Sequence, residues 1–191
     1  MYIGSHNSWS YLPAKHWWMR PFSFMAKCQS ADIKTQYGKY NVMCFDLRIR
    51  FGKNGKFLVS HGYVDYQICY SELMEDLKWL DSRGCYVRVI HEVRTKKNYT
   101  QENIENFRTE CERLVKMFPN IGFWCGRNLY NWKQDYSFPE EVSCYERYGS
   151  VSKLKYLIGW WPWLYAKIYN RKIMEQGTFH DILLIDYVNI Q

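Results

Sequence analysis

Apolar and polar positions alternate along the chain at two spacings, one typical of β-strands and one typical of α-helices. A strand-like apolar run leads into His6, and others follow at residues 44–51, 57–61, 85–92, 121–125 and 182–188, with weaker runs at 142–147 and 156–158. A Gly-Lys-Asn-Gly turn separates the runs 44–51 and 57–61, which predicts that they are two distinct strands.

Three further segments, 71–84, 100–119 and 162–177, have apolar residues at helical spacing. Ser71 and Thr100 are the predicted N-caps of the first two helices, and Gly84 and Pro119 end them. Strands that alternate with helices predict a parallel sheet in an α/β fold. A length of 191 residues without internal repeat or linker predicts one domain over residues 1–191.

Candidate chemistry gathers in the first third of the chain. His6 and His61 each end a strand-like run, and Asp46 and Arg48 lie between them in sequence. General acid–base cleavage of a phosphodiester needs two imidazoles that titrate near neutrality, a guanidinium that binds the anion and a carboxylate that orients its partners. These four residues are therefore candidate catalytic residues.

The segments around these residues carry a resemblance to a known family. GSHNSWSYL, CQSADIKTQ, FDLRI and FLVSHG follow one another in this order with short gaps, and this order resembles the catalytic half of phosphatidylinositol-specific phospholipase C. The match extends from Gly4 to Gly62, continues to Glu92, and is weak beyond except for the closing ILLIDYVN.

The resemblance implies a TIM-type (β/α) barrel, with His6 as the general base and His61 as the general acid. Eight βα units in this chain would have about 24 residues each, fewer than in a barrel of typical size. We therefore expect the barrel to be shortened or irregular.

Arg48 distinguishes two subfamilies. Calcium-dependent members of the family bind the metal through four positions. By resemblance, Asn7, Asp46 and Glu92 of this chain match three of them, and Arg48 stands at the fourth. Metal-independent bacterial members have an arginine there, whose fixed charge replaces the cation. We predict this variant, without metal or other cofactor, because a guanidinium inside a calcium site would repel the ion. A calcium site of Asn7, Asp46 and Glu92 stays the alternative, since Asn7 belongs to the metal-binding pattern.

Further polar residues follow predicted strands and would meet at the same mouth of the barrel. Asp186 ends the last apolar run, and we predict that it hydrogen-bonds to His6 and fixes its tautomer; a solvent-facing carboxylate is the alternative. The candidate contacts to the substrate head group are Asn7, Glu92, Arg94, Arg127 and Arg147.

The chain has a net charge of +7 and a pI near 9.0, which suits anionic partners. Motifs that read nucleic-acid bases are absent, which argues against nucleic acid. We expect a phospholipase C-like phosphodiesterase, a hydrolase or lyase of phospholipid or glycerophosphodiester. The alternative is a catalytically inactive barrel that binds an anionic head group or another phosphate-containing ligand.

Aromatic residues make up 19% of the chain and concentrate beside basic residues at 15–27 and 153–167. Trp17, Trp18, Trp160 and Trp161 are candidates for peripheral contact with a membrane, because tryptophan favours the lipid headgroup boundary. Packing in the core or against a partner protein is the other interpretation, and the sequence leaves both open.

The seven cysteines show no Cys-x-x-Cys pair and no zinc-ligand spacing, as expected for reduced thiols. No signal-peptide pattern is recognisable before His6, and the apolar stretch 158–165 is too short to span a bilayer. We expect a cytoplasmic protein, with peripheral membrane contact as an open question.

Overall fold

A parallel sheet organises the chain. The computed structural model describes residues 1–52, 55–93, 99–124, 136, 138, 144–146, 160–176 and 181–190. Six strands in these residues run parallel in the order β6 (Gly122–Trp124), β5 (Tyr86–His91), β2 (Val42–Phe51), β1 (Tyr2–Ser5), β8 (Ile182–Ile185) and β7 (Cys144–Glu146). In the described residues β6 and β7 are the two ends of this series, so the sheet is not closed there.

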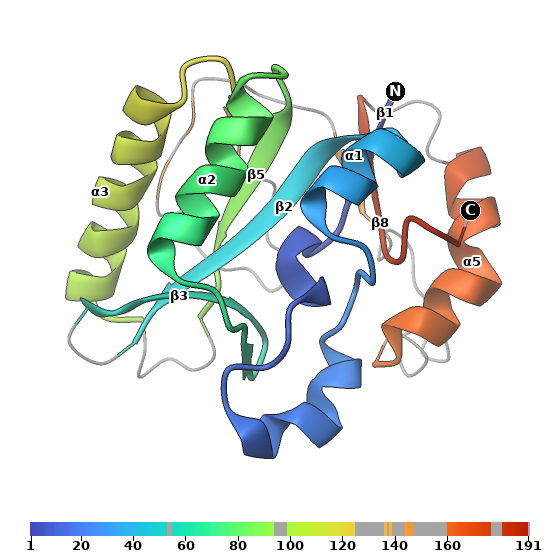
Figure 1. The fold of residues 1–191 in the computed structure, drawn as a ribbon, viewed down its shortest axis with the longest axis horizontal. Coiled ribbons are helices and arrows are strands. Elements are labelled where there is room, and N and C mark those ends of the chain that lie inside the picture. Colours follow the sequence, from blue (N-terminus) through green and yellow to red (C-terminus); the bar gives the residue numbers. More distant parts are fainter. Residues whose placement is uncertain are drawn as a thin grey trace.

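The described residues contain four α-helices, which are spread across the molecule (Figure 1). They are α1 (Ile33–Tyr40), α2 (Tyr70–Asp81), α3 (Gln101–Met117) and α5 (Pro162–Gln176), and two 3-10 helices, η1 (Ser8–Tyr11) and η2 (Trp17–Met25), precede them. Thr100 caps α3 as predicted, since its hydroxyl accepts a hydrogen bond from the backbone N–H of Asn103. The predicted cap Ser71 is wrong: Cys69 caps α2 in a reciprocal pair with Glu72.

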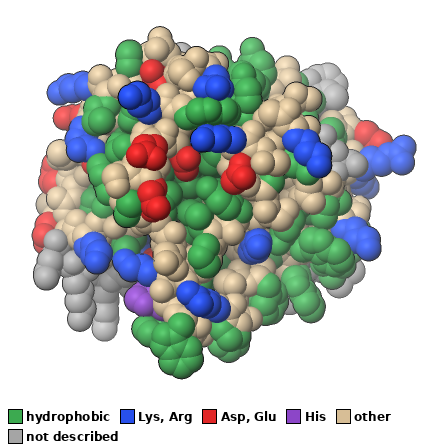
Figure 2. All heavy atoms as spheres, in the orientation of Figure 1, with side chains coloured by type: hydrophobic (Ala, Val, Ile, Leu, Met, Phe, Trp, Pro, Cys, Tyr) green, Lys and Arg blue, Asp and Glu red, His purple; other side chains and the backbone are tan. Residues whose placement is uncertain are grey.

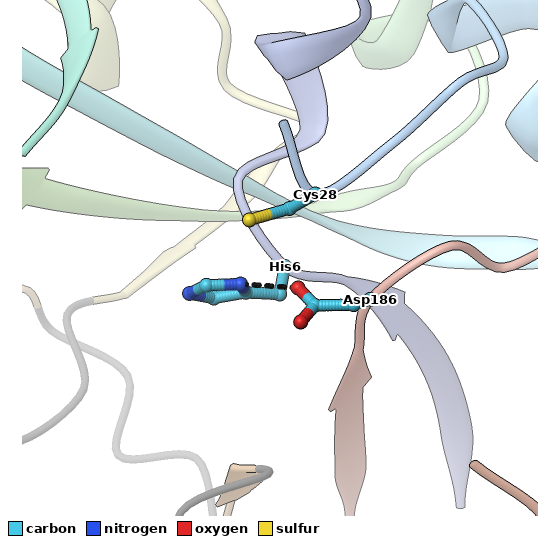
Figure 3. A group of neighbouring side chains, drawn as sticks. All are labelled: His6, Cys28 and Asp186. Carbon is cyan, nitrogen blue, oxygen red and sulfur yellow. Dashed lines mark hydrogen bonds and ion pairs between the residues drawn. The ribbon is translucent and has the colours of Figure 1, made fainter. Parts of the chain in front are cut away.

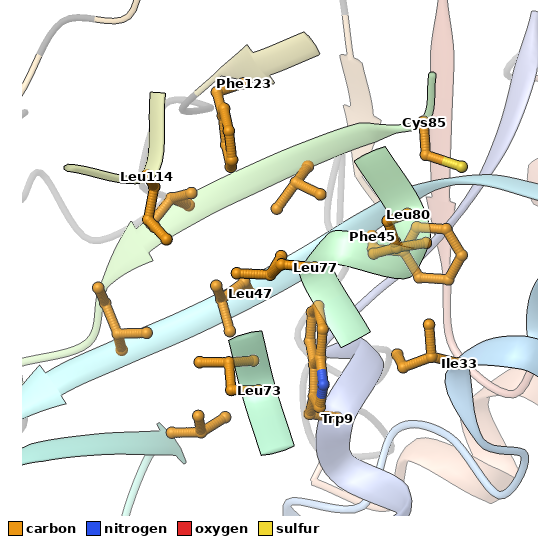
Figure 4. Packing of buried hydrophobic residues seen from close by; sticks show 14 of the residues in the cluster. Trp9, Ile33, Phe45, Leu47, Leu73, Leu77, Leu80, Cys85, Leu114 and Phe123 are labelled. Carbon is orange, nitrogen blue, oxygen red and sulfur yellow. The ribbon is translucent and has the colours of Figure 1, made fainter. Parts of the chain in front are cut away.

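The apolar stripe of α2 packs onto β2. Leu73, Leu77 and Leu80 are fully buried, and in the close view they lie against Phe45 and Leu47 of β2 (Figure 4). Burial of this stripe fixes α2 over the strand that carries Asp46 and Arg48.

The length of β2 determines where the second histidine lies. Along one edge β2 pairs with β1 only up to Phe45, and from Ile49 to Phe51 the antiparallel strand β3 (Phe57–His61) pairs with it. A short strand, β4 (Val64–Asp65), continues the antiparallel pairing. The expectation of a parallel sheet is therefore wrong for β3 and β4. This return strand brings His61 back along β2 toward the carboxyl end of β1, where His6 follows.

Candidate active site

His6 is held at the end of β1 with a defined tautomer. Its backbone N–H donates to Ile185 O of β8 at 2.9 Å, and its side chain is buried. Nδ1 lies 2.7 Å from Asp186 Oδ1, and Nε2 lies 2.8 Å from Arg48 Nη2. A guanidinium can only donate, so Nε2 accepts and the Nδ1 proton is directed at Asp186. His6 is thus neutral with a lone pair on Nε2, which is the form that a general base requires.

Asp186 follows β8 and is buried against His6. Burial raises the pKa of its carboxyl well above the usual range, while a hydrogen bond from the Cys28 thiol and the charge of Arg48 act to lower it. The next residue, Tyr187, has φ of 45°, an uncommon backbone conformation for a bulky residue. Its N–H donates to Cys28 O at 2.6 Å, which ties the carboxyl end of β8 to the segment after η2.

Arg48 connects three side chains of the site. Nε donates to Asp46 Oδ2 at 2.8 Å, Nη1 lies 3.4 Å from Glu92 Oε2, and Nη2 donates to His6. Burial acts to raise the pKa of Asp46, but the charges of Arg48 and Arg88 outweigh it and lower the pKa overall. The two carboxylates in turn raise the pKa of Arg48 against the effect of burial. The guanidinium therefore stays charged beside an ionised Asp46.

Asn7 supports the site from within. It adopts a left-handed conformation, with φ of 47°, and its backbone N–H donates to Asp46 Oδ2 at 2.9 Å. Its buried Nδ2 donates to Ala26 O at 3.2 Å and to the Tyr66 hydroxyl at 3.0 Å. The Ser8 hydroxyl accepts from the Asp46 backbone N–H at 2.8 Å, which joins the end of β1 to β2. The backbone and side-chain N–H groups of Asn7 thus connect the end of β1 to Asp46, Ala26 and Tyr66.

His61 faces His6 across a short gap. The two ring centroids are 5.4 Å apart with the planes at 87°. His61 Nδ1 lies 3.1 Å from Ala26 O, which can only accept, so Nδ1 donates. The following Gly62 has φ of 55° and donates its N–H to Glu92 Oε1 at 2.8 Å, so Glu92 links the turn after His61 to Arg48.

The structure brings together most of the residues singled out in the sequence. His6, Arg48, Asp46, Asp186, His61, Asn7 and Glu92 all contribute to one connected network. Arg94, Arg127 and Arg147 lie outside the described residues, so their predicted contacts with a head group stay predictions.

Three residues of the network were missed in the sequence. Arg88 on β5 is buried, with Nη1 3.8 Å from Asp46 Oδ1, and Tyr66 donates its hydroxyl to Ala26 O at 2.9 Å. Cys28 lies in the segment after η2, with Sγ 3.8 Å from His61 Nδ1. An arginine within the apolar run 85–92 was the one signal in the sequence, since a central strand seldom buries a charge without a partner.

An exposed aromatic surface accompanies the site. Trp17, Trp18, Trp160 and Trp161 are exposed, Trp17 to 74%, so the interpretation of these four as core residues is wrong. Phe24 of η2 lies 5.5 Å from the Trp161 ring, which joins the two aromatic stretches. In the space-filling view, hydrophobic and basic side chains gather at the lower edge of the molecule, where η2 lies in Figure 1 (Figure 2). No helix in the described residues is long and apolar enough to cross a membrane.

Comparison with known proteins identifies the fold. No protein-family model and no curated protein matches the chain. The phosphatidylinositol-specific phospholipase C from Listeria monocytogenes superimposes with a TM-score of 0.62 at 13% identity, over 99% of this chain and 89% of that one. The enzyme from Staphylococcus aureus superimposes with a TM-score of 0.55 at 14% identity, over 97% and 85%. The predicted TIM-type (β/α) barrel class is therefore confirmed, and the described strands form an incompletely closed version of it.

Proposed function

We propose that the protein is a phosphodiesterase that cleaves a phosphatidylinositol-type phospholipid or a related glycerophosphodiester. The observation that carries the proposal is the pair of imidazoles 5.4 Å apart, one of which keeps a lone pair on Nε2 beside a guanidinium. A protein that only binds a head group needs neither this tautomer nor a second histidine facing it. The resemblance of the fold to bacterial phospholipases of this specificity supports the choice of substrate.

His6, Arg48 and His61 each have one task in the proposed reaction, and Asp186 assists His6. His6 Nε2 takes the proton from the attacking hydroxyl, which belongs to the substrate or to water, and Asp186 stabilises the imidazolium that forms. Arg48 turns its Nη donors from His6 to the phosphate oxygens, where negative charge grows in the transition state. His61 donates its Nε2 proton to the leaving oxygen. His6 is then protonated and His61 neutral, and proton exchange with solvent restores the starting state of both.

The proposal includes a reaction without metal. Arg48 already bridges Asp46 and Glu92, the two carboxylates that would be calcium ligands. A calcium ion bound to these residues would lie against a guanidinium, which is electrostatically unfavourable. The donor set therefore fits a fixed arginine better than a cation.

We also propose that the exposed aromatic surface contacts the lipid interface. Trp17 and Trp18 on η2 and Trp160 and Trp161 near α5 offer amphipathic rings, and the exposed Lys167 lies with Nζ 5.2 Å from the Trp163 ring centroid. Such rings beside basic side chains favour the headgroup region of an anionic bilayer. The end of η2 also supplies Ala26 O to His61, so this surface borders the site directly.

A substrate panel tests the proposal. The purified protein is assayed with phosphatidylinositol vesicles, phosphatidylcholine vesicles and soluble glycerophosphodiesters, in chelator and in added calcium, with phosphorus NMR to identify products. We expect turnover in chelator that His6→Ala and His61→Ala each lower by about 100-fold or more. His16→Ala, assayed on the soluble substrates, is the matched control. Head-group binding without turnover of any diester would instead identify an inactive binding barrel.

A further inference from the structure

The buried thiol of Cys28 lies close to His6 and Asp186, and together these three side chains offer a set of donor atoms that could hold a metal ion. Cys28 is fully buried, and its side chain converges with those of His6 and Asp186 (Figure 3). One donor atom from each of the three residues lies within 4.8 Å of the other two. The three side chains come from separate elements, the ends of β1 and β8 and the segment after η2, so the fold itself sets their convergence.

We propose that His6, Cys28 and Asp186 bind a thiophilic divalent cation of the zinc class and that the metal-bound form is inactive. The binding site stands on the geometry of these residues alone, whereas the inhibition rests on the function proposed above. The site is separate in chemistry from a calcium site, because calcium prefers oxygen ligands and has little affinity for a thiol.

The donor set suits zinc in type, number and charge. Zinc binds imidazole nitrogen, thiolate sulfur and carboxylate oxygen at about 2.0–2.3 Å, and three protein ligands with one open position make a common site. Tetrahedral geometry at these lengths separates neighbouring donors by roughly 3.3–3.7 Å. The His6 and Asp186 atoms lie 2.7 Å apart and all three donors lie within 4.8 Å, so each needs to move by only about 1 Å or less.

Charge balance favours a divalent ion in this buried place. A thiolate and a carboxylate together neutralise the two charges of the metal, and the imidazole ligand is neutral, so the metal complex itself carries no net charge.

Metal binding at this place removes the general base. A metal on His6 Nδ1 requires the ring proton to be on Nε2, where it would face the Arg48 Nη2 donor that lies 2.8 Å away. Nε2 can then accept no proton from an attacking hydroxyl, and Asp186 no longer orients the ring. Occupancy by metal and turnover of a phosphodiester therefore exclude each other.

Cobalt(II) absorption tests the binding directly. Chelator-treated protein is titrated with cobalt(II), and we expect a thiolate-to-cobalt charge-transfer band with d–d absorption of tetrahedral type, at one ion per chain, which zinc(II) displaces. Cys28→Ser and Asp186→Asn should lose the band or weaken binding at least about 100-fold. Cys69→Ser, which removes an exposed thiol on the N-cap of α2, is the matched control and should keep the band. Near-ultraviolet circular dichroism verifies that each variant is folded.

The outcomes separate the two proposals. The site is contradicted if the folded, unmodified protein gives no thiolate band, or if the band persists in Cys28→Ser. If the band is present and the protein cleaves a phosphodiester, zinc(II) should halve turnover at the concentration that half-saturates the site in the cobalt-competition titration and abolish it at saturation; undiminished turnover at saturation would refute the inhibition. If the protein cleaves no phosphodiester, the proposed function fails while the cobalt result still decides the metal site.

Discussion

Replacing Arg48 with lysine keeps the positive charge of the site but removes the planar arrangement of N–H donors that the guanidinium provides. The guanidinium uses three nitrogens at once, toward Asp46 at 2.8 Å, His6 at 2.8 Å and Glu92 at 3.4 Å. A single ammonium can replace one of these contacts, most readily the one to the buried Asp46. Its remaining N–H groups all belong to one nitrogen, so they cannot reproduce the two-pronged contact that the planar guanidinium makes with phosphate oxygens.

The size of the effect follows from the contacts that are lost. Removing one preorganised donor to a developing oxyanion costs about 100- to 1,000-fold in kcat, or roughly 3–4 kcal/mol. Arg48→Lys should cost about this much, because the charge remains and at least one donor to the phosphate is lost. KM should change far less than kcat, since this contact strengthens as the transition state forms.

Arg50→Lys is the matched control for this prediction. Arg50 lies two residues further along β2 and pairs with Asp65 through Nε at 2.6 Å and through Nη2. It has the same kind of carboxylate partner, but within the described part of the chain it makes no hydrogen bond with His6, so Arg50→Lys should lower stability without a comparable loss of kcat. Steady-state kinetics on a soluble phosphodiester in chelator, corrected for the folded fraction, measures both variants. Near-normal kcat in Arg48→Lys, or an equal loss in Arg50→Lys, would refute the reasoning.

Three further changes test other parts of the structure. Asp186→Asn should lower kcat by about 1,000-fold or more with the fold retained, because an amide no longer holds the Nδ1 proton of His6; an unchanged kcat would remove Asp186 from the mechanism. Burial raises the pKa of Glu110 from its ordinary 4.5 to about 7, so its contribution to stability falls as pH rises between these values. In urea unfolding, Glu110→Gln should therefore gain about 1 kcal/mol above pH 7, a figure reduced for partial exposure, and nothing near pH 4; equal gains at both would contradict it. Gly4→Ala should lose about 1–3 kcal/mol in the same assay, since its Cβ would lie 2.5 Å from Leu184 Cδ2; unchanged stability would show that β1 and β8 are less tightly packed.

The parts of the fold that are set locally could be predicted from the sequence. β2 ends at Phe51 and β3 begins at Phe57, so these are two separate strands as expected, and Thr100 with the apolar stripe that follows it marks α3. The cap of α2 was misplaced by two residues, because a cysteine seldom caps a helix and Ser71 is the stronger signal in sequence. Helix α1 was not predicted, since its short segment contains Gly38 and few apolar residues.

The same distinction between local and distant contacts separates the site residues that the sequence predicted from those that it did not. His6, Arg48 and His61 stand in short motifs, so their spacing and neighbours point to one chemistry. Arg88 and Cys28 join the site only through the pairing of β5 with β2 and through the segment after η2. In sequence, Arg88 signals only that a charge stands in an apolar strand, and Cys28 signals nothing, because Asp46 and His61, the site residues that they approach, are distant along the chain.

The aromatic stretches could not be assigned to surface or core from composition. Trp9 is fully buried and Trp17 is exposed to 74%, although they stand eight positions apart in equally aromatic surroundings. Burial depends on what the rest of the chain places against each ring, and that information is tertiary.

The division of labour between the two histidines is the central claim, and a change of leaving group tests it most directly. The rates of the unmodified protein, His6→Ala and His61→Ala are compared on a soluble diester with an alkyl leaving group and on its nitrophenyl counterpart, both in chelator. A nitrophenolate leaves without protonation, so the loss of rate in His61→Ala should shrink by at least about tenfold on that substrate, while the loss in His6→Ala should persist. Equal losses in His61→Ala on both substrates would contradict its assignment as the general acid.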